Sequence, residues 1–156
     1  MDRLRTGILA GLVAGIIMGI VAVLFFYTGV FTLNPMVILA NLVMTEAMAA
    51  TVTGFIVGII ISLVVAAFYG VVFTFLLKDR ENSIYWGITY GVALYFISPG
   101  IIGPALGIFP PLWESNLPNN IGALVTRVIY GAVLGYLVHI WLRDPAQVNE
   151  GGGEGQ

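Results

Sequence analysis

Arg127 is the charged residue that lies most plainly inside an apolar stretch of this chain, seven residues past Asn120. An ionisable side chain at such a position, if the stretch spans a membrane, points to function unless a partner neutralises it. Glu46 and Glu114 are the carboxylates expected on the same side of the membrane. We therefore predict that Arg127 forms an intramembrane ion pair with one of these acids or reaches a lipid phosphate by extending along the helix. An ion pair of this kind would require neither transport nor catalysis.

The sequence gives little support for metal binding, cofactor binding or catalysis. His139 is the single histidine, so a metal site or a bis-histidine haem lacks its remaining ligands, and we interpret it as an interfacial residue. Met36, Met44 and Met48 are interpreted as gap-filling apolar residues and not as soft metal ligands. There is no cysteine, and paired carboxylates, nucleophile–base pairs and phosphate-binding loops are absent. The sequence therefore predicts no catalytic residue, no cofactor and no metal, and a protein that is not an enzyme.

Composition places these residues in a bilayer. The chain has 156 residues, of which 59% are hydrophobic and 9% are charged, against about 25% charged residues in a soluble domain. The net charge is −2 and there is no basic run. Nucleic acid is therefore excluded as a partner.

Four segments are long and apolar enough to be membrane helices, which need about 20 such residues. They cover residues 6–26, 53–77, 84–97 or beyond, and 121–142. The sequence predicts an all-α membrane protein, a four-transmembrane-helix bundle in one domain (residues 1–144), followed by a flexible tail (145–156) rich in glycine.

Irregular structure is predicted at two places, the third span and the connection before the second span. Prolines follow Ser98 at Pro99 and Pro104, so the third helix is expected to kink or end near Ser98. Before the second span, Asn34 can cap a helix that begins at Pro35. We expect a short outer interfacial helix over residues 35–48, with a long tilted second span as the alternative.

Basic residues set the predicted orientation, because cytoplasmic flanks retain positive charge. Arg3 and Arg5, Lys78 and Arg80, and Arg143 fall on one side of a four-span chain. Both termini are therefore expected in the cytoplasm of a cell with this protein in its plasma membrane. The connections 31–50 and 98–120 are expected outside.

Glycines recur four residues apart in every span, a spacing typical of close helix contacts in membranes and, in the first span, of a glycine zipper. We predict helix packing through two sets of them: Gly7, Gly11, Gly15 and Gly19 in the first span, and Gly54, Gly58, Gly87, Gly91, Gly131 and Gly135 in the others. The first helix should be an axis for its neighbours, within this chain or in another copy.

The second and fourth spans end alike. The segments "YGVVFTFLLKD" (residues 69–79) and "YGAVLGYLVHIWLRD" (130–144) share Tyr-Gly, a valine, an aromatic residue and a final basic residue followed by aspartate. This echo favours two duplicated helical hairpins. Coincidence in a restricted apolar alphabet is the alternative.

Several motifs carry a family resemblance: "YWGITYGVALYF", a proline-rich connection, the asparagines Asn119 and Asn120, and "VIYGAVLGYLV". Over residues 84–140 the chain resembles the uncharacterised four-span bacterial membrane proteins of the YqhR type, and upstream "NPMVIL" is similar to that family's first outer loop. The resemblance implies the four-span topology. It implies no reaction or ligand.

The sequence thus favours a non-enzymatic accessory, assembly or structural subunit of a membrane complex, with the bilayer and other subunits or copies of itself as partners. The alternative is a small-solute or ion transporter or channel, suggested by the broken third span and Arg127. A substrate route would need more polar lining than Ser62, Thr74, Thr89 and Thr126 provide. A lipid-modifying enzyme lacks a visible catalytic group.

Overall fold

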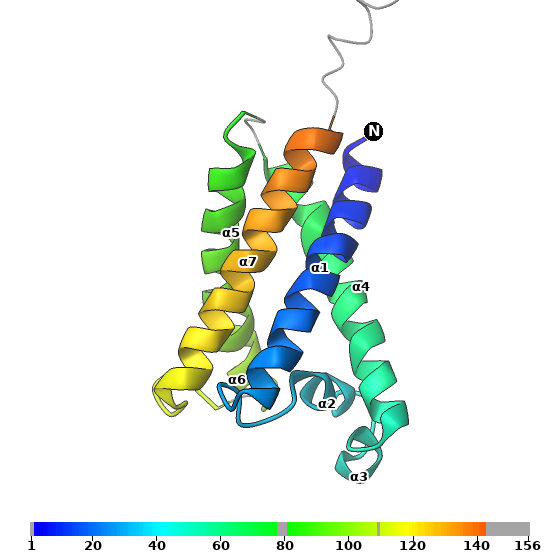
Figure 1. The fold of residues 1–156 in the computed structure, drawn as a ribbon, viewed down its shortest axis with the longest axis vertical. Helices are drawn as coiled ribbons and strands as arrows, with labels where there is room; N and C mark the ends of the chain where they lie inside the picture. Colours follow the sequence, from blue (N-terminus) through cyan, green and yellow to red (C-terminus); the bar gives the residue numbers. More distant parts are fainter. Residues whose placement is uncertain (1, 78–80, 109, 143–156) are drawn as a thin grey trace, which may run out of the picture.

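The computed structural model describes residues 2–77, 81–108 and 110–142. Within these ranges the chain is helical, without strands (Figure 1). The helices are α1 (Arg3–Tyr27), α2 (Pro35–Ala40), α3 (Glu46–Ala49), α4 (Val52–Leu76), α5 (Ser83–Ile97), the π-helical turn η1 (Ser98–Ile102), α6 (Gly103–Ala105) and α7 (Leu117–Trp141). Four stretches are long and apolar enough to cross a membrane: α1, α4, the continuous stretch Ser83–Ala105, and α7. The predicted fold class is therefore confirmed.

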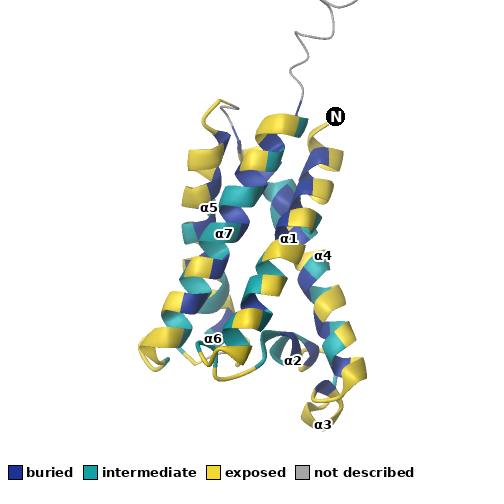
Figure 2. Ribbon diagram, viewed as in Figure 1, coloured by how far each residue is buried: buried dark blue, intermediate teal, exposed yellow. Residues whose placement is uncertain are grey.

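The four long helices run side by side, with α2, α3 and α6 gathered at one end (Figure 1). We call that end the loop end, and the end that holds the first turn of α1 and the last turn of α7 the terminal end. Large apolar residues such as Ile60 and Phe68 are exposed, while glycines, alanines and a few larger residues such as Tyr130 and Leu134 are buried. Figure 2 shows buried and exposed positions alternating along each long helix. A bundle in a bilayer needs this pattern, because hydrocarbon surrounds it. The predicted tail 145–156 and the basic residues Lys78, Arg80 and Arg143 lie outside the described residues.

The element expected over residues 35–48 is two short helices. Asn34 caps α2 by accepting a hydrogen bond from the Met36 amide at 3.0 Å, and Pro35 is its first residue. The helix ends at Ala40, and α3 begins only at Glu46. The two short helices are separate from α4, because α4 has its own cap: the side chain of Thr51 accepts a hydrogen bond from the amide of Gly54.

The fourth long helix begins earlier than the sequence suggests. The side chain of Asn116 accepts a hydrogen bond from the amide of Asn119 at 2.9 Å, so the helix starts at Leu117 and not at residue 121. Pro118 lies in the first turn, where a missing amide hydrogen costs no helical hydrogen bond. The proline therefore belongs to the helix and not to the connection.

The third span changes its helical form where prolines enter. α5 ends at Ile97, and η1 carries Pro99 at its second position. Proline cannot donate to the preceding turn, and widening that turn to a π-helix accommodates the loss. The helical path thus continues to Ala105.

Glycine contacts join the long helices into two hairpins, α1 with α4 and α5 with α7. A Cβ added to Gly70 would collide with the Gly7 carbonyl oxygen and lie 2.7 Å from Gly11 Cα. At Gly131 it would collide with the Gly87 carbonyl oxygen and lie 3.0 Å from Gly91 Cα. Gly7, Gly11 and Gly70 of the first hairpin therefore correspond to Gly87, Gly91 and Gly131 of the second.

One hydroxyl group also joins the helices of each hairpin near the terminal end. Thr74 Oγ1 donates to the Arg3 carbonyl oxygen at 3.0 Å, and Ser83 Oγ donates to the Gly135 carbonyl oxygen at 3.0 Å. In the glycine correspondence, Arg3 matches Ser83 and Thr74 matches Gly135. The same two positions are thus bridged in both hairpins, with the donor on opposite helices. These matching contacts support the duplicated-hairpin interpretation over coincidence.

Candidate functional site around Arg127

Arg127 lies near the middle of α7, about 15 Å along the helix axis from Leu117. Its backbone faces α5, because a Cβ added to Gly91 would collide with the Arg127 carbonyl oxygen. In the first hairpin the matching collision is between Gly11 and the carbonyl oxygen of Ala66, at 2.5 Å. Arg127 thus occupies the place that alanine holds in the other hairpin. Its side chain therefore extends away from the contact between α5 and α7, toward the other helices of the bundle.

The guanidinium group lies between three elements. Its Nη1 donates to Met18 Sδ of α1 at 3.3 Å, and its Nη2 is 3.5 Å from Ser98 Oγ, the first residue of η1. Thioether sulfur is a weak acceptor, and a guanidinium group has five N–H donors. The described protein therefore satisfies only a small part of the hydrogen-bonding capacity of this partly buried cation.

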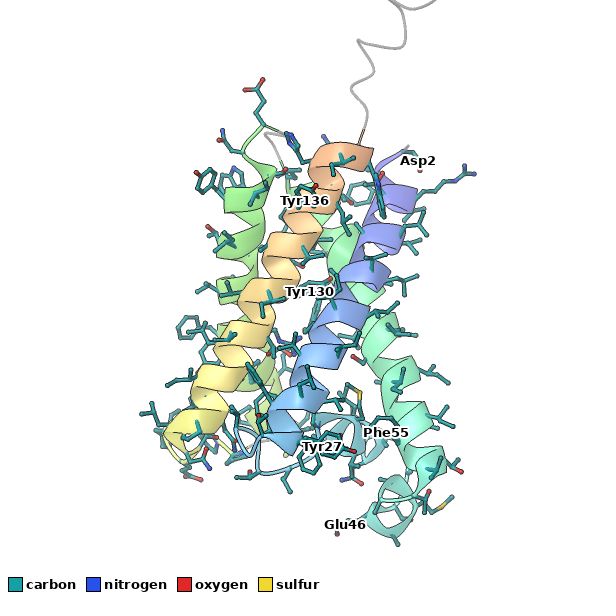
Figure 3. The ribbon with its side chains drawn as sticks, viewed as in Figure 1. Asp2, Tyr27, Glu46, Phe55, Tyr130 and Tyr136 are labelled. Carbon is teal, nitrogen blue, oxygen red and sulfur yellow. The ribbon has the colours of Figure 1, made fainter. Side chains whose placement is uncertain are left out.

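The predicted ion pair is not formed in this structure. Neither Glu46 nor Glu114 lies within ion-pair distance of Arg127. Both acids are exposed, and Glu46 lies at the loop end on α3 (Figure 3). The reason is the direction of the arginine side chain, which runs into the bundle toward α1 and η1. Contact between Arg127 and a lipid phosphate stays a prediction.

Tyrosine side chains form the rest of this region. Tyr130, three residues after Arg127, donates from its Oη to the Ala66 carbonyl oxygen at 2.6 Å and lies inside the bundle (Figure 3). Tyr90 donates to the Tyr69 carbonyl oxygen at 2.9 Å. Tyr69 and Tyr130 are both near enough to interact electrostatically with the guanidinium group. Phenol groups therefore connect α4 to α5 and to α7 around Arg127.

These tyrosine contacts were missed by sequence reasoning. The signal available was that Tyr69, Tyr90 and Tyr130 lie within spans, away from the interfaces where tyrosine is usually enriched. A phenol within hydrocarbon needs an acceptor, so such a tyrosine predicts a hydrogen bond to another helix. The acceptors are backbone carbonyl groups, which no residue type identifies.

The glycines named from sequence serve several contacts. Gly7, Gly11 and Gly15 face α4, while Gly87 and Gly91 face Gly131, Gly135 and their neighbours on α7. In α4, by contrast, a Cβ at Gly54 would collide with Ala49 of α3, and a Cβ at Gly58 would collide with Met36 of α2. Gly19 meets only the end of the Met36 side chain, at 3.7 Å. The glycine pattern of α4 therefore packs the short helices as well as a neighbouring span.

Most hydroxyl groups considered for a polar route bond to the backbone. Thr89 donates to the Tyr85 carbonyl oxygen at 3.0 Å, Thr126 donates to the Ala123 carbonyl oxygen at 2.9 Å, and Thr74 bridges to α1. Ser62 faces an apolar pocket. Over the part of the chain that the structure describes, no three His, Cys, Asp or Glu residues gather where they could hold a metal ion.

Comparison with known proteins gives one match. A family model described as "Conserved membrane protein YqhR" matches residues 1–150. Neither the curated proteins nor the solved structures gave a match. The match covers all four spans and the region around Arg127.

Proposed function

Since the chain belongs to the YqhR family of conserved membrane proteins, we propose that it is a non-catalytic membrane subunit with a structural, accessory or assembly role in a larger complex. The observation that carries this proposal is the use of polar groups within the spans. Thr74, Ser83, Tyr90 and Tyr130 each donate to a backbone carbonyl group of another long helix. These side chains hold the bundle together and leave few polar groups to bind or move a solute.

The same packing restricts how a partner can bind. The glycines of α1 and α5, together with Gly131 and Gly135 of α7, meet helices of this chain, so their small faces are occupied within the molecule. Partner subunits or further copies must therefore contact the outward faces, where bulky residues such as Ile60, Phe68 and Phe75 are exposed. Such contacts depend on shape complementarity between bulky side chains. Replacing lipid by protein around an apolar side chain adds no hydrophobic driving force, because lipid tails are equally apolar.

We propose that the protein lies in the plasma membrane with both termini in the cytoplasm. Arg3 and Arg5 lie at the terminal end, and no lysine or arginine occurs in the connections at the loop end. This asymmetry supports the orientation by the positive-inside rule.

The test is purification from native membranes in mild detergent after brief chemical crosslinking, followed by mass spectrometry of everything crosslinked to the chain. A defined complex containing other membrane subunits, or further copies of this chain, is the expected result. Phe68→Ala on α4 and Phe96→Ala on α5 each remove one bulky exposed side chain, and the variant that weakens the complex identifies the outward face that binds the partner. An uncrosslinked monomer in every preparation would overturn the proposal.

Transport is the second candidate, and one observation favours it. Arg127 contacts Ser98 at the start of η1, and π-helical turns inside membrane helices are frequent at functional sites. A cation with unused donors beside a helix irregularity is the arrangement expected of an anion pathway. Anion flux into liposomes containing the purified protein, abolished by Arg127→Leu while the thermal unfolding curve stays unchanged, would replace the subunit proposal with this one.

A further inference from the structure

The helices α1 and α4 touch at one end and diverge toward the other. At Gly11 an added Cβ would lie 2.5 Å from the Ala66 carbonyl oxygen, but at Gly19 it would meet nothing of α4. Figure 1 shows the two helices separating toward the loop end, where α2 lies between them. We call the space between α1 and α4 on the bilayer side of α2 the wedge.

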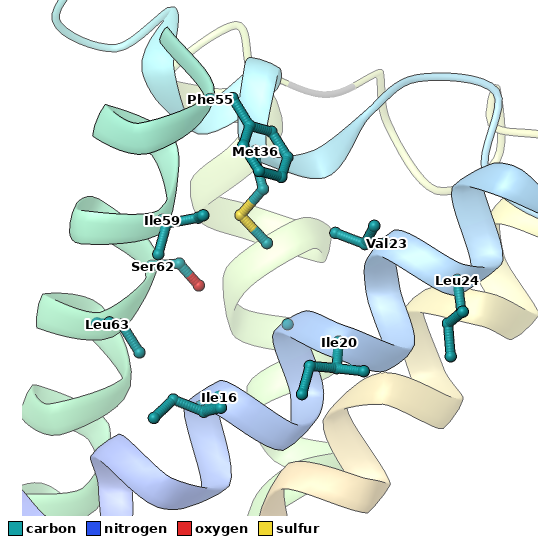
Figure 4. A pocket seen from close by; sticks show the side chains of 11 residues that line it. Ile16, Ile20, Val23, Leu24, Met36, Phe55, Ile59, Ser62 and Leu63 are labelled. Atoms are coloured by element: carbon teal, nitrogen blue, oxygen red, sulfur yellow. The ribbon is translucent and has the colours of Figure 1, made fainter. Parts of the chain in front are cut away.

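The wedge contains a cavity of about 360 Å³ lined by residues of α1, α2 and α4 (Figure 4). Apart from Ser62 its lining is apolar, and none of the lining residues is charged. Met36 of α2 closes the cavity at the loop end, and Leu63 of α4 lies at its other end (Figure 4). An occupant of this cavity must therefore present an apolar surface to it.

The dimensions restrict the occupant further. The lining runs from Gly15 to Leu24 along α1, which corresponds to about 13 Å of helix axis. A volume of about 360 Å³ over that length gives a mean cross-section of roughly 27 Å² for the centre of a water-sized sphere, which becomes roughly 60 Å² when the sphere's own radius of about 1.4 Å is added on every side. A transmembrane helix with its side chains needs roughly 80 Å² or more, whereas one hydrocarbon chain at van der Waals contact occupies roughly 15–20 Å². The cavity is thus wide enough to hold an acyl chain and too narrow to enclose a helix.

The wedge is also open in the direction from which such a chain would come. Ile16, Ile20 and Leu24 of its wall are about half exposed on the outside of the bundle, whereas Gly15 and Met36 are buried at its back. The long axis of the cavity follows the helices, and acyl chains in a bilayer run in the same direction. α2 covers the loop end, so entry is sideways from the membrane.

We propose that the wedge binds an acyl chain of a phospholipid in the leaflet at the loop end. The cavity takes up the chain along α1 and leaves the headgroup outside, near α2. Because no lysine or arginine lines it, binding does not depend on the charge of the headgroup. The chain fills space that α1 and α4 leave between them and connects both helices to α2.

The test uses a phosphatidylcholine with a photoactivatable diazirine in the middle of one acyl chain, mixed into phosphatidylcholine vesicles that contain the full-length protein. After illumination, mass spectrometry maps the labelled residues. Preferential labelling of Ile20 and Met36 over the exposed Phe68 is the expected result. Equal labelling of all exposed apolar faces would overturn the proposal.

Gly19→Leu is the decisive variant, because a Cβ at this position lies at an ordinary 3.7 Å from Met36 Cε and the longer side chain then enters the cavity. Labelling of Met36 should fall by about tenfold, as expected for a loss of 1.4 kcal/mol or more in chain binding. Ala93→Leu, on the exposed face of α5, is the matched control and should leave the labelling unchanged. Undiminished labelling of Met36 in Gly19→Leu would refute the site.

If Gly19→Leu fails to fold, Ile20→Trp takes its place, since Ile20 is 57% exposed at the mouth and a larger side chain can cover the opening. The same tenfold loss is expected, and its absence counts against the proposal equally. Disulfide crosslinks between an Ile20→Cys chain and an Ile59→Cys chain under mild oxidation, together with a loss of lipid adducts, would assign the wedge to a second copy and overturn the lipid proposal.

Discussion

Alanine at Gly11 adds one methyl group at a point where the backbones of α1 and α4 lie close together. The new Cβ would be 2.5 Å from the Ala66 carbonyl oxygen and 3.1 Å from both Ala67 Cα and Gly70 Cα. Carbon–oxygen contacts of this type settle at about 3.3–3.6 Å, so the helices must separate by roughly 0.8 Å. All three neighbours are backbone atoms or Cα atoms, and no side-chain rotation can relieve the collision.

The matched variant is Gly19→Ala, in the same helix and with the same chemical change. Its Cβ would lie 3.7 Å from Met36 Cε, which is ordinary contact. Both variants share the gain in helix propensity, about 1 kcal/mol in water, so their difference isolates the collision. Overpacking of this kind costs about 1–3 kcal/mol, and we expect Gly11→Ala to be less stable than Gly19→Ala by that amount.

The assay is reversible unfolding by sodium dodecyl sulfate in mixed micelles with a mild detergent, followed by far-ultraviolet circular dichroism. Gly91→Ala extends the test to the second hairpin, because its Cβ would collide with the Arg127 carbonyl oxygen in the matching position. Its loss of stability should resemble that of Gly11→Ala. Equal stability of Gly11→Ala and Gly19→Ala would show that the close approach of α1 and α4 is wrong.

Three further variants test the site and the topology. Arg127→Leu should change the free energy of unfolding by less than about 1 kcal/mol, because removing a cation from hydrocarbon offsets the lost contacts with Met18 and Ser98; a loss above about 3 kcal/mol in the same titration would contradict this. Tyr130→Phe removes the hydrogen bond to Ala66 and should destabilise by about 1 kcal/mol, and an unchanged unfolding midpoint would argue against that bond. Glu114→Cys, in a chain without other cysteines, should react with a membrane-impermeant maleimide on intact cells; reaction only after lysis would contradict the proposed orientation.

The spans could be predicted from sequence because they depend on length and composition alone. Their ends could not be placed as well, since caps depend on which of several candidate residues is used. Asn116, Asn119 and Asn120 all precede the apolar part of α7, and the structure caps the helix with Asn116. Choosing among them required knowing that Pro118 lies inside the first turn.

The contacts of Arg127 could not be predicted from the sequence, for a different reason. The direction of its side chain follows from the rotation of α7 about its axis, and the contacts of Gly91 with the backbone at Arg127 set that rotation. Glycine spacing indicates that a helix has a close-packing face but does not name the helix that meets it. Opposite charge and the predicted side of the membrane suggested Glu46 and Glu114, whereas the contacts in the structure are Met18 and Ser98.

The two-hairpin arrangement has a consequence for how the protein enters the membrane. A ribosome delivers α1 and α4 before α5 and α7, and the glycine contacts of the first hairpin need nothing that follows it in the chain. We expect the first hairpin to be complete in the bilayer while the second is still being synthesised. Arg127 enters the bilayer only after this first hairpin, and Met18 is already in place beside the position that its guanidinium group will take.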